Sequence, residues 1–218
     1  MEQKPLTPAQ AWHMLQRGNE RFLSGRPKHP RQDHVTRTEL AHEQHPHAVV
    51  FCCSDSRVAP ELLFDEGVGD LFVIRNAGQV VSDPVVGSFE YAVELLDVPL
   101  IVVIGHQECG AVAAAIAELG TNAAPLPPYI ARITELIKPS VRQVAGTGVI
   151  DPAAVDAAAV GRAHVEHTIG DLLAASEILS SAVANGTLAI VGAGYQLVEG
   201  RVTPDTVVGV IEEKEPLS

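Results

Sequence analysis

The sequence predicts an α/β domain organised around a parallel β-sheet, and three observations lead to this class. First, short runs of mostly β-branched apolar residues, each ended by a turn signal, are typical of buried parallel strands. Second, segments with helical spacing of apolar residues stand between these runs. Third, the stretch around Glu199 and Gly200 has the pattern of a hairpin, which adds an antiparallel edge strand. The four runs are 49–53, 71–75, 99–105 and 188–192.

Residues 1–47 predict a helical arm ahead of the sheet. Thr7 is a suitable N-cap and Pro8 suits a first turn, so we expect a helix over 8–22. A polar stretch follows, in which 35–44 is expected to form a short helix. Its histidines show no repeated ligand spacing, and we expect them on a solvated surface. They are His29, His34, His42, His45 and His47.

Apolar residues at helical spacing also predict the helices that accompany the strands. The expected helices cover 60–64, 84–97, 111–119, 129–144 and 152–184. No internal repeat and no sharp change in composition divides the chain, so we expect a single domain over 1–218. Its parts are the arm at 1–47, an α/β core at 48–211 and an acidic tail at 212–218.

The composition narrows the range of partners. A formal net charge of −12 and the lack of a basic block disfavour nucleic acid and anionic membranes. The N-terminus lacks a secretory pattern, and no segment reaches the roughly 18 apolar residues of a spanning helix. We therefore expect a soluble, cytoplasmic protein. Three cysteines, two of them adjacent, do not suggest a disulfide framework, and in a reducing compartment they indicate metal binding or catalysis.

Chemically active side chains follow two of the predicted strands. Cys53 and Asp55 stand in the turn after the first strand, and His106 and Cys109 stand in the turn after the third. The carboxyl ends of parallel strands form the edge at which open α/β sheets bind ligands. Two thiols, an imidazole and a carboxylate at this edge suit a four-coordinate zinc ion. Cys109 also begins a predicted helix, whose dipole favours a thiolate.

Other interpretations of these residues stay open at this point. The cysteines could be small buried apolar residues, and His106 could be a hydrogen-bonded core residue. Cys52 points to the opposite face from Cys53, so we expect a buried thiol, with a vicinal disulfide as the alternative. His164 and His167, three residues apart on a predicted helix, could bind a second metal, but without a third ligand a structural role is favoured.

Four motifs occur in order along the chain. They are Cys-Ser-Asp-Ser-Arg at 53–57, Phe-Val-Ile-Arg-Asn-Ala-Gly at 72–78, Glu-Tyr-Ala-Val at 90–93 and Gly-His-Gln-Glu-Cys-Gly at 105–110. Together they resemble the β-class carbonic anhydrases, in particular the bacterial, plant-type members. The resemblance implies a Rossmann-like sheet of four parallel strands in the order 2-1-3-4, with an antiparallel strand at the edge. It also implies a homodimer or homotetramer whose active sites lie at subunit interfaces.

The same resemblance assigns roles to particular residues. It implies one Zn²⁺ per chain, held by Cys53, His106 and Cys109. It implies that substrate or bicarbonate is bound by a glutamine side chain, an apolar CO2 pocket formed partly by the neighbouring subunit, and a backbone N–H. The residues at these positions are Gln44 for the glutamine, Phe72, Ala77 and Tyr91 for the pocket, and Gly110 for the N–H.

Asp55 and Arg57 can be interpreted physically as a catalytic pair. Two thiolates cancel the charge of zinc, so the ion acidifies its water less than it would with three neutral histidines. Asp55 can compensate by accepting the hydrogen of the hydroxide, while Arg57 holds that carboxylate in a bidentate pair. If Asp55 instead swings onto the metal as a fourth ligand, the site is closed to water. The alternative role for the pair is a structural salt bridge.

The function expected from these residues is reversible hydration of CO2 to bicarbonate and a proton by zinc-bound hydroxide, which makes the protein a zinc lyase. Hydrolysis of COS or CS2 by the same centre is an alternative within the fold. A non-catalytic zinc or ligand-sensing protein, with Asp55 as a permanent fourth ligand, is another. A thiol redox protein that uses Cys52 and Cys53 is a third.

Overall fold

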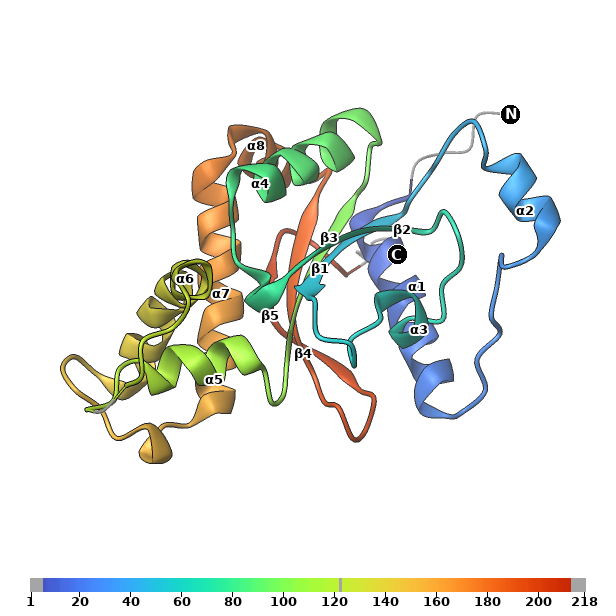
Figure 1. Ribbon diagram of the computed structural model, residues 1–218. Coiled ribbons are helices and arrows are strands. Elements are labelled where there is room, and N and C mark those ends of the chain that lie inside the picture. The colour runs from blue at the N-terminus through green and yellow to red at the C-terminus, as the bar shows by residue number, and fades with distance from the viewer. Residues whose placement is uncertain (1–5, 122, 213–218) are drawn as a thin grey trace, which may run out of the picture.

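The computed structural model describes residues 6–121 and 123–212, and its centre is a five-stranded mixed sheet (Figure 1). The strand order is β2-β1-β3-β4-β5, with the first four strands parallel and β5 antiparallel to β4. This confirms the predicted order and the antiparallel edge strand. The strands are β1 (Ala48–Cys53), β2 (Leu71–Asn76), β3 (Leu100–His106), β4 (Ala189–Tyr195) and β5 (Val202–Val208).

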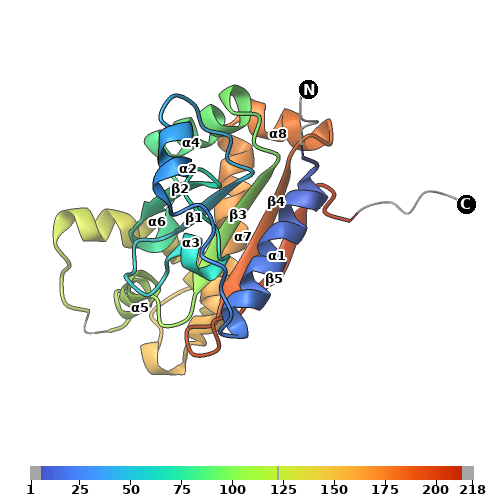
Figure 2. The same ribbon diagram turned by 90° about the vertical axis from the view of Figure 1, so that its right-hand side faces the viewer.

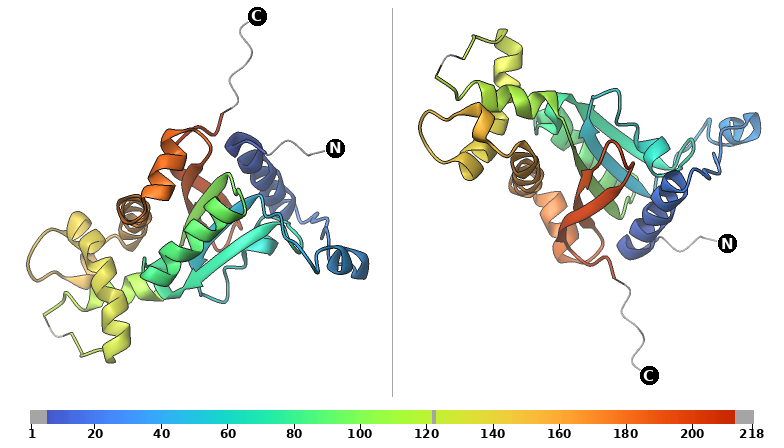
Figure 3. Two further views of the ribbon diagram at one scale, coloured as in Figure 1. Left: turned by 90° about the horizontal axis from the view of Figure 1, so that it is seen from above. Right: turned by 90° about the horizontal axis from the view of Figure 1, so that it is seen from below.

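Helices cover both faces of the sheet, because its strands are apolar on both sides (Figure 3). One face packs against α1 and α3, and the other against α4, α7 and α8. Helices α5 and α6 pack beside the start of α7 in a third apolar cluster. The helices are α1 (Pro8–Leu23), α2 (His34–Glu39), α3 (Pro60–Leu63), α4 (Asp83–Glu90), α5 (Gly110–Ala117), α6 (Pro128–Ala145), α7 (Ala157–Ala175) and α8 (Glu177–Ala184).

Helix α1 is fixed at both ends by its sequence. Thr7 and Gln10 form a capping box at the N-terminus. Towards the other end, the buried Asn19 donates to Gly200 O at 2.9 Å and accepts from Val202 N at 3.0 Å. Trp12 on the same helix is buried against the sheet, so the helix packs on its own domain along β4 and β5 (Figure 2).

Three predicted helices are wrong in their extent, and the one expected over 35–44 already ends at Glu39 as α2. The helix expected over 152–184 begins with a short 3₁₀ turn and breaks at Ser176, which ends α7 in an extended conformation and caps α8 through its hydroxyl. That hydroxyl also donates to Glu90 Oε1 at 2.7 Å. The helix expected over 84–97 changes after α4 into a π-helix, Tyr91–Leu95. Of the predicted tail, only Glu212 lies within the described residues.

His47 contradicts the expectation of a solvated histidine, because it is buried beside two carboxylates. Its Nε2 lies 3.7 Å from Glu66 Oε1. Arg31 bridges the two acids: its Nη2 lies 3.4 Å from Glu66 Oε2, and its Nε donates to Asp70 Oδ2 at 2.9 Å. We call Arg31, His47, Glu66 and Asp70 the anchoring cluster, since it ties the polar stretch after α1 to the sheet.

Two glycines allow α7 to lie unusually close to the sheet. A Cβ on Gly105 of β3 or on Gly192 of β4 would stand 2.7 Å from the side chain of Val165 in either case. Neither strand position could therefore carry a side chain without moving the helix. This close approach holds α7 directly against β3 and β4.

Candidate metal centre

Three predicted ligands converge at the carboxyl ends of neighbouring strands. Cys53 ends β1, His106 ends β3 and Cys109 is the N-cap of α5. Their ligand atoms all lie within 4.8 Å of one another, and all three residues are buried. Strands β1 and β3 are paired in parallel register, which is why two residues far apart in sequence meet here.

The imidazole of His106 is oriented for a metal. Its Nδ1 lies 2.8 Å from the carbonyl oxygen of Gln107, which can only accept, so Nδ1 carries the proton. Nε2 is then an unprotonated acceptor, and it is buried with no hydrogen-bond partner among the described residues. A buried nitrogen of this kind is destabilising unless something binds it, and a zinc ion beside two sulfurs satisfies it.

The two thiols influence each other's ionisation, because their sulfur atoms lie within 4.8 Å of each other. The contact with Cys109 lowers the pKa of Cys53, and the same contact together with burial raises the pKa of Cys109. Gly78 N also donates to Cys53 Sγ at 3.3 Å. Burial lowers the pKa of His106, but its contacts with Cys53 and Gln107 raise it to above the ordinary value overall. A divalent cation would displace the thiol protons, because cysteine binds a metal as the thiolate.

Asp55 and Arg57 form the predicted bidentate pair. Arg57 Nε donates to Oδ1 at 2.9 Å and Nη2 donates to Oδ2 at 2.7 Å. These bonds keep the pKa of Asp55 well below its usual range. Arg57 Nη2 also donates to Glu108 O at 3.1 Å, which links the pair to the turn before Cys109. The carboxylate is thus held by arginine and is not among the three converging ligands.

Two further residues shape this edge and were not predicted as site residues. Arg75 donates to Cys53 O at 3.0 Å and to Asp55 O at 2.8 Å, so it fixes the backbone between ligand and carboxylate. Gly78 supplies the N–H to the sulfur of Cys53. Both residues stand at or just after the end of β2. Because the predicted strand order places β2 beside β1, the sequence could have indicated that they lie near Cys53.

The predicted substrate residues fall into two groups. Gly110 begins α5 directly after Cys109, and Ala77 precedes Gly78, so both border the ligands. Phe72 stacks on Tyr91 with ring centroids 6.1 Å apart, but it pairs with Val49 near the start of β1. Val49 lies four residues before Cys53 on β1, so Phe72 is about 13 Å from Cys53 along the strand direction. Gln44 is exposed ahead of β1, and so also lies towards this far end.

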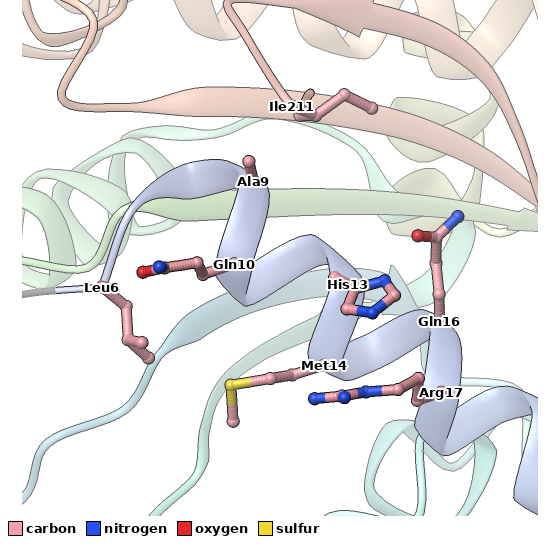
Figure 4. Close-up of a pocket in the computed structure, with 8 residues that line it drawn as sticks. All are labelled: Leu6, Ala9, Gln10, His13, Met14, Gln16, Arg17 and Ile211. Atoms are coloured by element: carbon pink, nitrogen blue, oxygen red, sulfur yellow. The ribbon is translucent and has the colours of Figure 1, made fainter. Parts of the chain in front are cut away.

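The remaining cysteine and histidines have separate roles. Cys52 lies on the other face of the sheet, in the core beneath α1 and α3, and no disulfide joins it to Cys53. Burial raises its pKa to about 12. His164 Nε2 lies 2.7 Å from Gly78 O, and His167 Nδ1 lies 2.7 Å from Ser140 Oγ. A surface groove along α1 and Ile211 (Figure 4) contains none of the candidate residues.

Comparisons with known proteins agree with this geometry. A family model described as "Carbonic anhydrase" matches residues 48–202. Carbonic anhydrase 2 of Mycobacterium tuberculosis is 46% identical over 207 residues, which cover 95% of this chain and 97% of the relative. A carbonic anhydrase of Mycolicibacterium smegmatis is 43% identical over 208 residues, 94% of this chain and 97% of the relative.

Solved structures give the same result. The β-carbonic anhydrase CcaA superposes with a TM-score of 0.66 at 27% identity, over 88% of this chain and 86% of that chain. A Coccomyxa β-carbonic anhydrase, solved in complex with acetazolamide, gives 0.65 at 27% identity, over 79% and 78%.

The fold and the cysteine–histidine–cysteine centre define a zinc enzyme of the α/β class. The chain belongs to the β-carbonic anhydrases. Its reaction is the zinc-dependent, reversible hydration of CO2 to bicarbonate and a proton, as the motifs predicted. Within residues 6–121 and 123–212, no helix combines the length and apolar character needed to cross a bilayer.

Proposed function

We propose that Cys53, His106 and Cys109 hold the zinc ion, and that Asp55 and Arg57 are the catalytic side chains. The observation that carries this proposal is the bidentate Asp55–Arg57 pair beside three converging ligands. When bound, zinc supplies an acidified water as the nucleophile for CO2. The carboxylate of Asp55 accepts a hydrogen bond from that nucleophile, which directs an oxygen lone pair at the substrate.

Arg57 performs two tasks in this proposal. Its guanidinium keeps Asp55 ionised, so the carboxylate acts only as an acceptor at neutral pH. The pair also restrains the carboxylate, since both oxygens are held at once. Without this restraint Asp55 could become a fourth metal ligand, which would leave the water position blocked. The closed form and the open form therefore differ in the partner of one carboxylate.

The product bicarbonate is an anion, and the N-terminus of α5 faces the same edge. Gly110 is the first residue of that helix, and N–H groups of a first turn are free to bind an anion. Ala77 borders the ligands from the end of β2. We assign Gly110 to the anion and Ala77 to the apolar wall beside CO2.

Gln44, Phe72 and Tyr91 serve the metal centre of a partner subunit in this proposal. They lie towards the amino end of β1, whereas the ligands of the same chain lie at its carboxyl end. Tyr91 is 45% exposed although it stacks on Phe72, and β2 is an edge strand of the sheet. We therefore propose a homodimer or homotetramer with composite sites. The cysteines, all unpaired, fit the reducing cytoplasm.

Removal of the restraint on Asp55 tests the catalytic pair. We expect Arg57→Ala to retain about one zinc per chain while CO2 hydration in a stopped-flow assay falls by about 10²-fold or more. Arg57→Lys keeps the charge but not the planar fork, so it should recover only part of the activity. Near-normal hydration by Arg57→Ala would refute the restraining role. Zinc removal with a chelator should abolish turnover in every variant.

Subunit mixing tests the composite site. Gln44→Ala and His106→Ala proteins should each be weakly active or inactive alone. A mixed dimer contains one site with intact zinc ligands from the first chain and an intact Gln44 from the second. Recovery of activity on mixing supports a shared site, whereas sites formed within one chain would show no recovery.

A further inference from the structure

A strained turn lies between the ligand Cys53 and helix α7. This turn, Ala77–Gln79, follows β2, and Gly78 within it has a φ of +76° and a ψ of 12°. Gln79 also has a positive φ, +41°, which is unfavourable for a residue with a side chain. The Gly78 N–H reaches Cys53 Sγ only while the turn keeps this conformation.

The side chain that holds the turn is His164 of α7. It is 3% exposed, and its Nε2 lies 2.7 Å from the carbonyl oxygen of Gly78. That oxygen can only accept, so Nε2 carries the proton. Thr168, one helical turn later, bonds mainly to His164 O at 2.8 Å and lies 3.5 Å from Gln79 O. The strong contact between α7 and the turn is thus the one made by His164.

We propose that His164 is a positioning residue for the zinc ligand Cys53. Its Nε2–H holds the Gly78 carbonyl, and the N–H of the same residue then points at the ligand sulfur. A hydrogen bond to a thiolate withdraws negative charge from the sulfur and tunes the metal that it binds. Because two thiolates already offset the charge of zinc, this contact makes the ion a stronger acid towards its water.

The surroundings of the histidine favour this role over simple packing. Its Nδ1 is buried with no hydrogen-bond partner among the described residues. An unpaired buried acceptor destabilises the fold, and an apolar side chain of similar size would avoid that loss. Burial also lowers the pKa of His164, which keeps the ring neutral with its proton on Nε2. This position therefore provides a hydrogen-bond donor, Nε2–H, although the unpaired Nδ1 lowers stability.

Three variants separate the hydrogen bond from the shape of the side chain. His164→Leu removes the donor, and His164→Gln places an amide N–H near the position of Nε2. His167→Leu is the matched control, because His167 stands on the same helix and bonds to Ser140 instead of the turn. Each protein is loaded with Co²⁺, whose sulfur-to-metal absorption band reports the ligand bonds. Metal affinity is measured by competition with a chelator.

We expect His164→Leu to shift the sulfur-to-cobalt band and to weaken metal binding by about 10-fold or more. His164→Gln should restore the band and stay within about threefold of the native affinity, and His167→Leu should match the native protein. An unchanged band and affinity in folded His164→Leu would overturn the proposal. Equal losses in the leucine and glutamine variants would also overturn it, since shape alone would then matter.

A measurement on the native protein covers the case in which His164→Leu does not fold. Nitrogen-15 NMR of the histidine rings should show His164 neutral, with the proton on Nε2, and a proton on Nδ1 would overturn the proposal. The inference rests on the proposed ligand role of Cys53, which Cys53→Ser tests separately. If Cys53→Ser keeps full native metal affinity and an unchanged sulfur-to-cobalt band, the ligand assignment is refuted. If Cys53→Ser loses the metal but His164→Leu has no effect, only the positioning role is refuted.

Discussion

Among the described residues, two groups of three side chains bring metal-ligating atoms within 4.8 Å of one another, and the two groups have different chemistry. The metal centre, Cys53, His106 and Cys109, stands at the carboxyl ends of β1 and β3. The anchoring cluster stands at the other end of the sheet, where His47 and Asp70 directly precede β1 and β2. Proximity alone would make both groups candidate metal sites.

The difference lies in what already binds the ligand atoms. Asp70 Oδ2 accepts from Gly67 N at 2.6 Å as well as from Arg31, and Arg31 also pairs with Glu66. A cation is therefore built into the anchoring cluster. The metal centre has no arginine or lysine on its ligand atoms among the described residues, although His106 Nε2 and His47 Nε2 both lack a hydrogen-bond partner there. A soft ion such as zinc also prefers the thiolates. The thiols of one group and the arginine already bound in the other identify the metal site, whereas proximity and an unpartnered histidine nitrogen are common to both groups.

Substitution of one histidine by alanine in each group is expected to give the largest difference in zinc content and activity between the two sites. His106→Ala should lose zinc, and CO2 hydration should fall by about 10³-fold, because the metal contributes several kcal/mol to transition-state stabilisation. His47→Ala should keep one zinc per chain and most of the activity. Metal analysis after dialysis and a stopped-flow assay measure both. Stoichiometric zinc in His106→Ala, or its loss in His47→Ala, would contradict the contrast.

Loss of a carboxylate from the anchoring cluster should reduce stability without affecting the metal. Asp70→Ala leaves Gly67 N and Arg31 Nε without their acceptor, and Arg31 then pairs only with Glu66. Since Arg31 is 44% exposed and can turn to solvent, we expect a loss of about 2–4 kcal/mol of unfolding free energy rather than the full cost of a buried pair. Denaturant unfolding at neutral pH measures this. Unchanged stability would show that the cluster does not anchor the chain.

The sequence predicted the metal centre better than it predicted the anchoring cluster. Cys53, His106 and Cys109 follow strands whose order is constrained by the parallel topology, so their meeting point follows from local patterns. The burial of His47 depends on Arg31, Glu66 and Asp70, which no local pattern relates to it.

The wrong helix extents have the same origin. The break at Ser176 goes with the packing of α8 against α4 and with the hydrogen bond from Ser176 to Glu90, and these partners are distant from Ser176 in sequence. Gly78 was predicted in part: a glycine at this position indicated a turn, but nothing in the sequence indicated the hydrogen bond from its N–H to Cys53.

Gly78→Ala should affect the metal centre from the backbone side. A Cβ there would stand 2.8 Å from the Cβ of Ala111 and 3.0 Å from Cδ1 of Ile137, in a conformation with positive φ. We expect a loss of about 1–3 kcal/mol of stability together with weaker metal binding. Gly146→Ala is the control, because that glycine also has positive φ but meets no atom within 4 Å. Equal metal affinity in the two variants would show that the Gly78 turn does not support the ligand.

The smallest expected effect is a pH-dependent one beside the anchoring cluster. Asp65 accepts from Arg21 Nε at 2.5 Å and from Lys28 N at 2.9 Å, and although burial opposes it, these bonds lower the pKa of the carboxyl. Because the pKa of Asp65 is lower in the folded state, the ionised carboxylate stabilises the fold at any pH above the unfolded-state pKa of about 3.9. This contribution is lost as the pH falls through the folded-state pKa.

Asp65→Asn should therefore cost about 1 kcal/mol at neutral pH and progressively less below pH of about 4. Glu20→Gln, on the exposed side of α1, should show no such trend in denaturant unfolding from neutral to acidic pH. A difference between native and Asp65→Asn proteins that stays constant with pH would mean that the charge of Asp65 does not hold the arm, and that only its shape does.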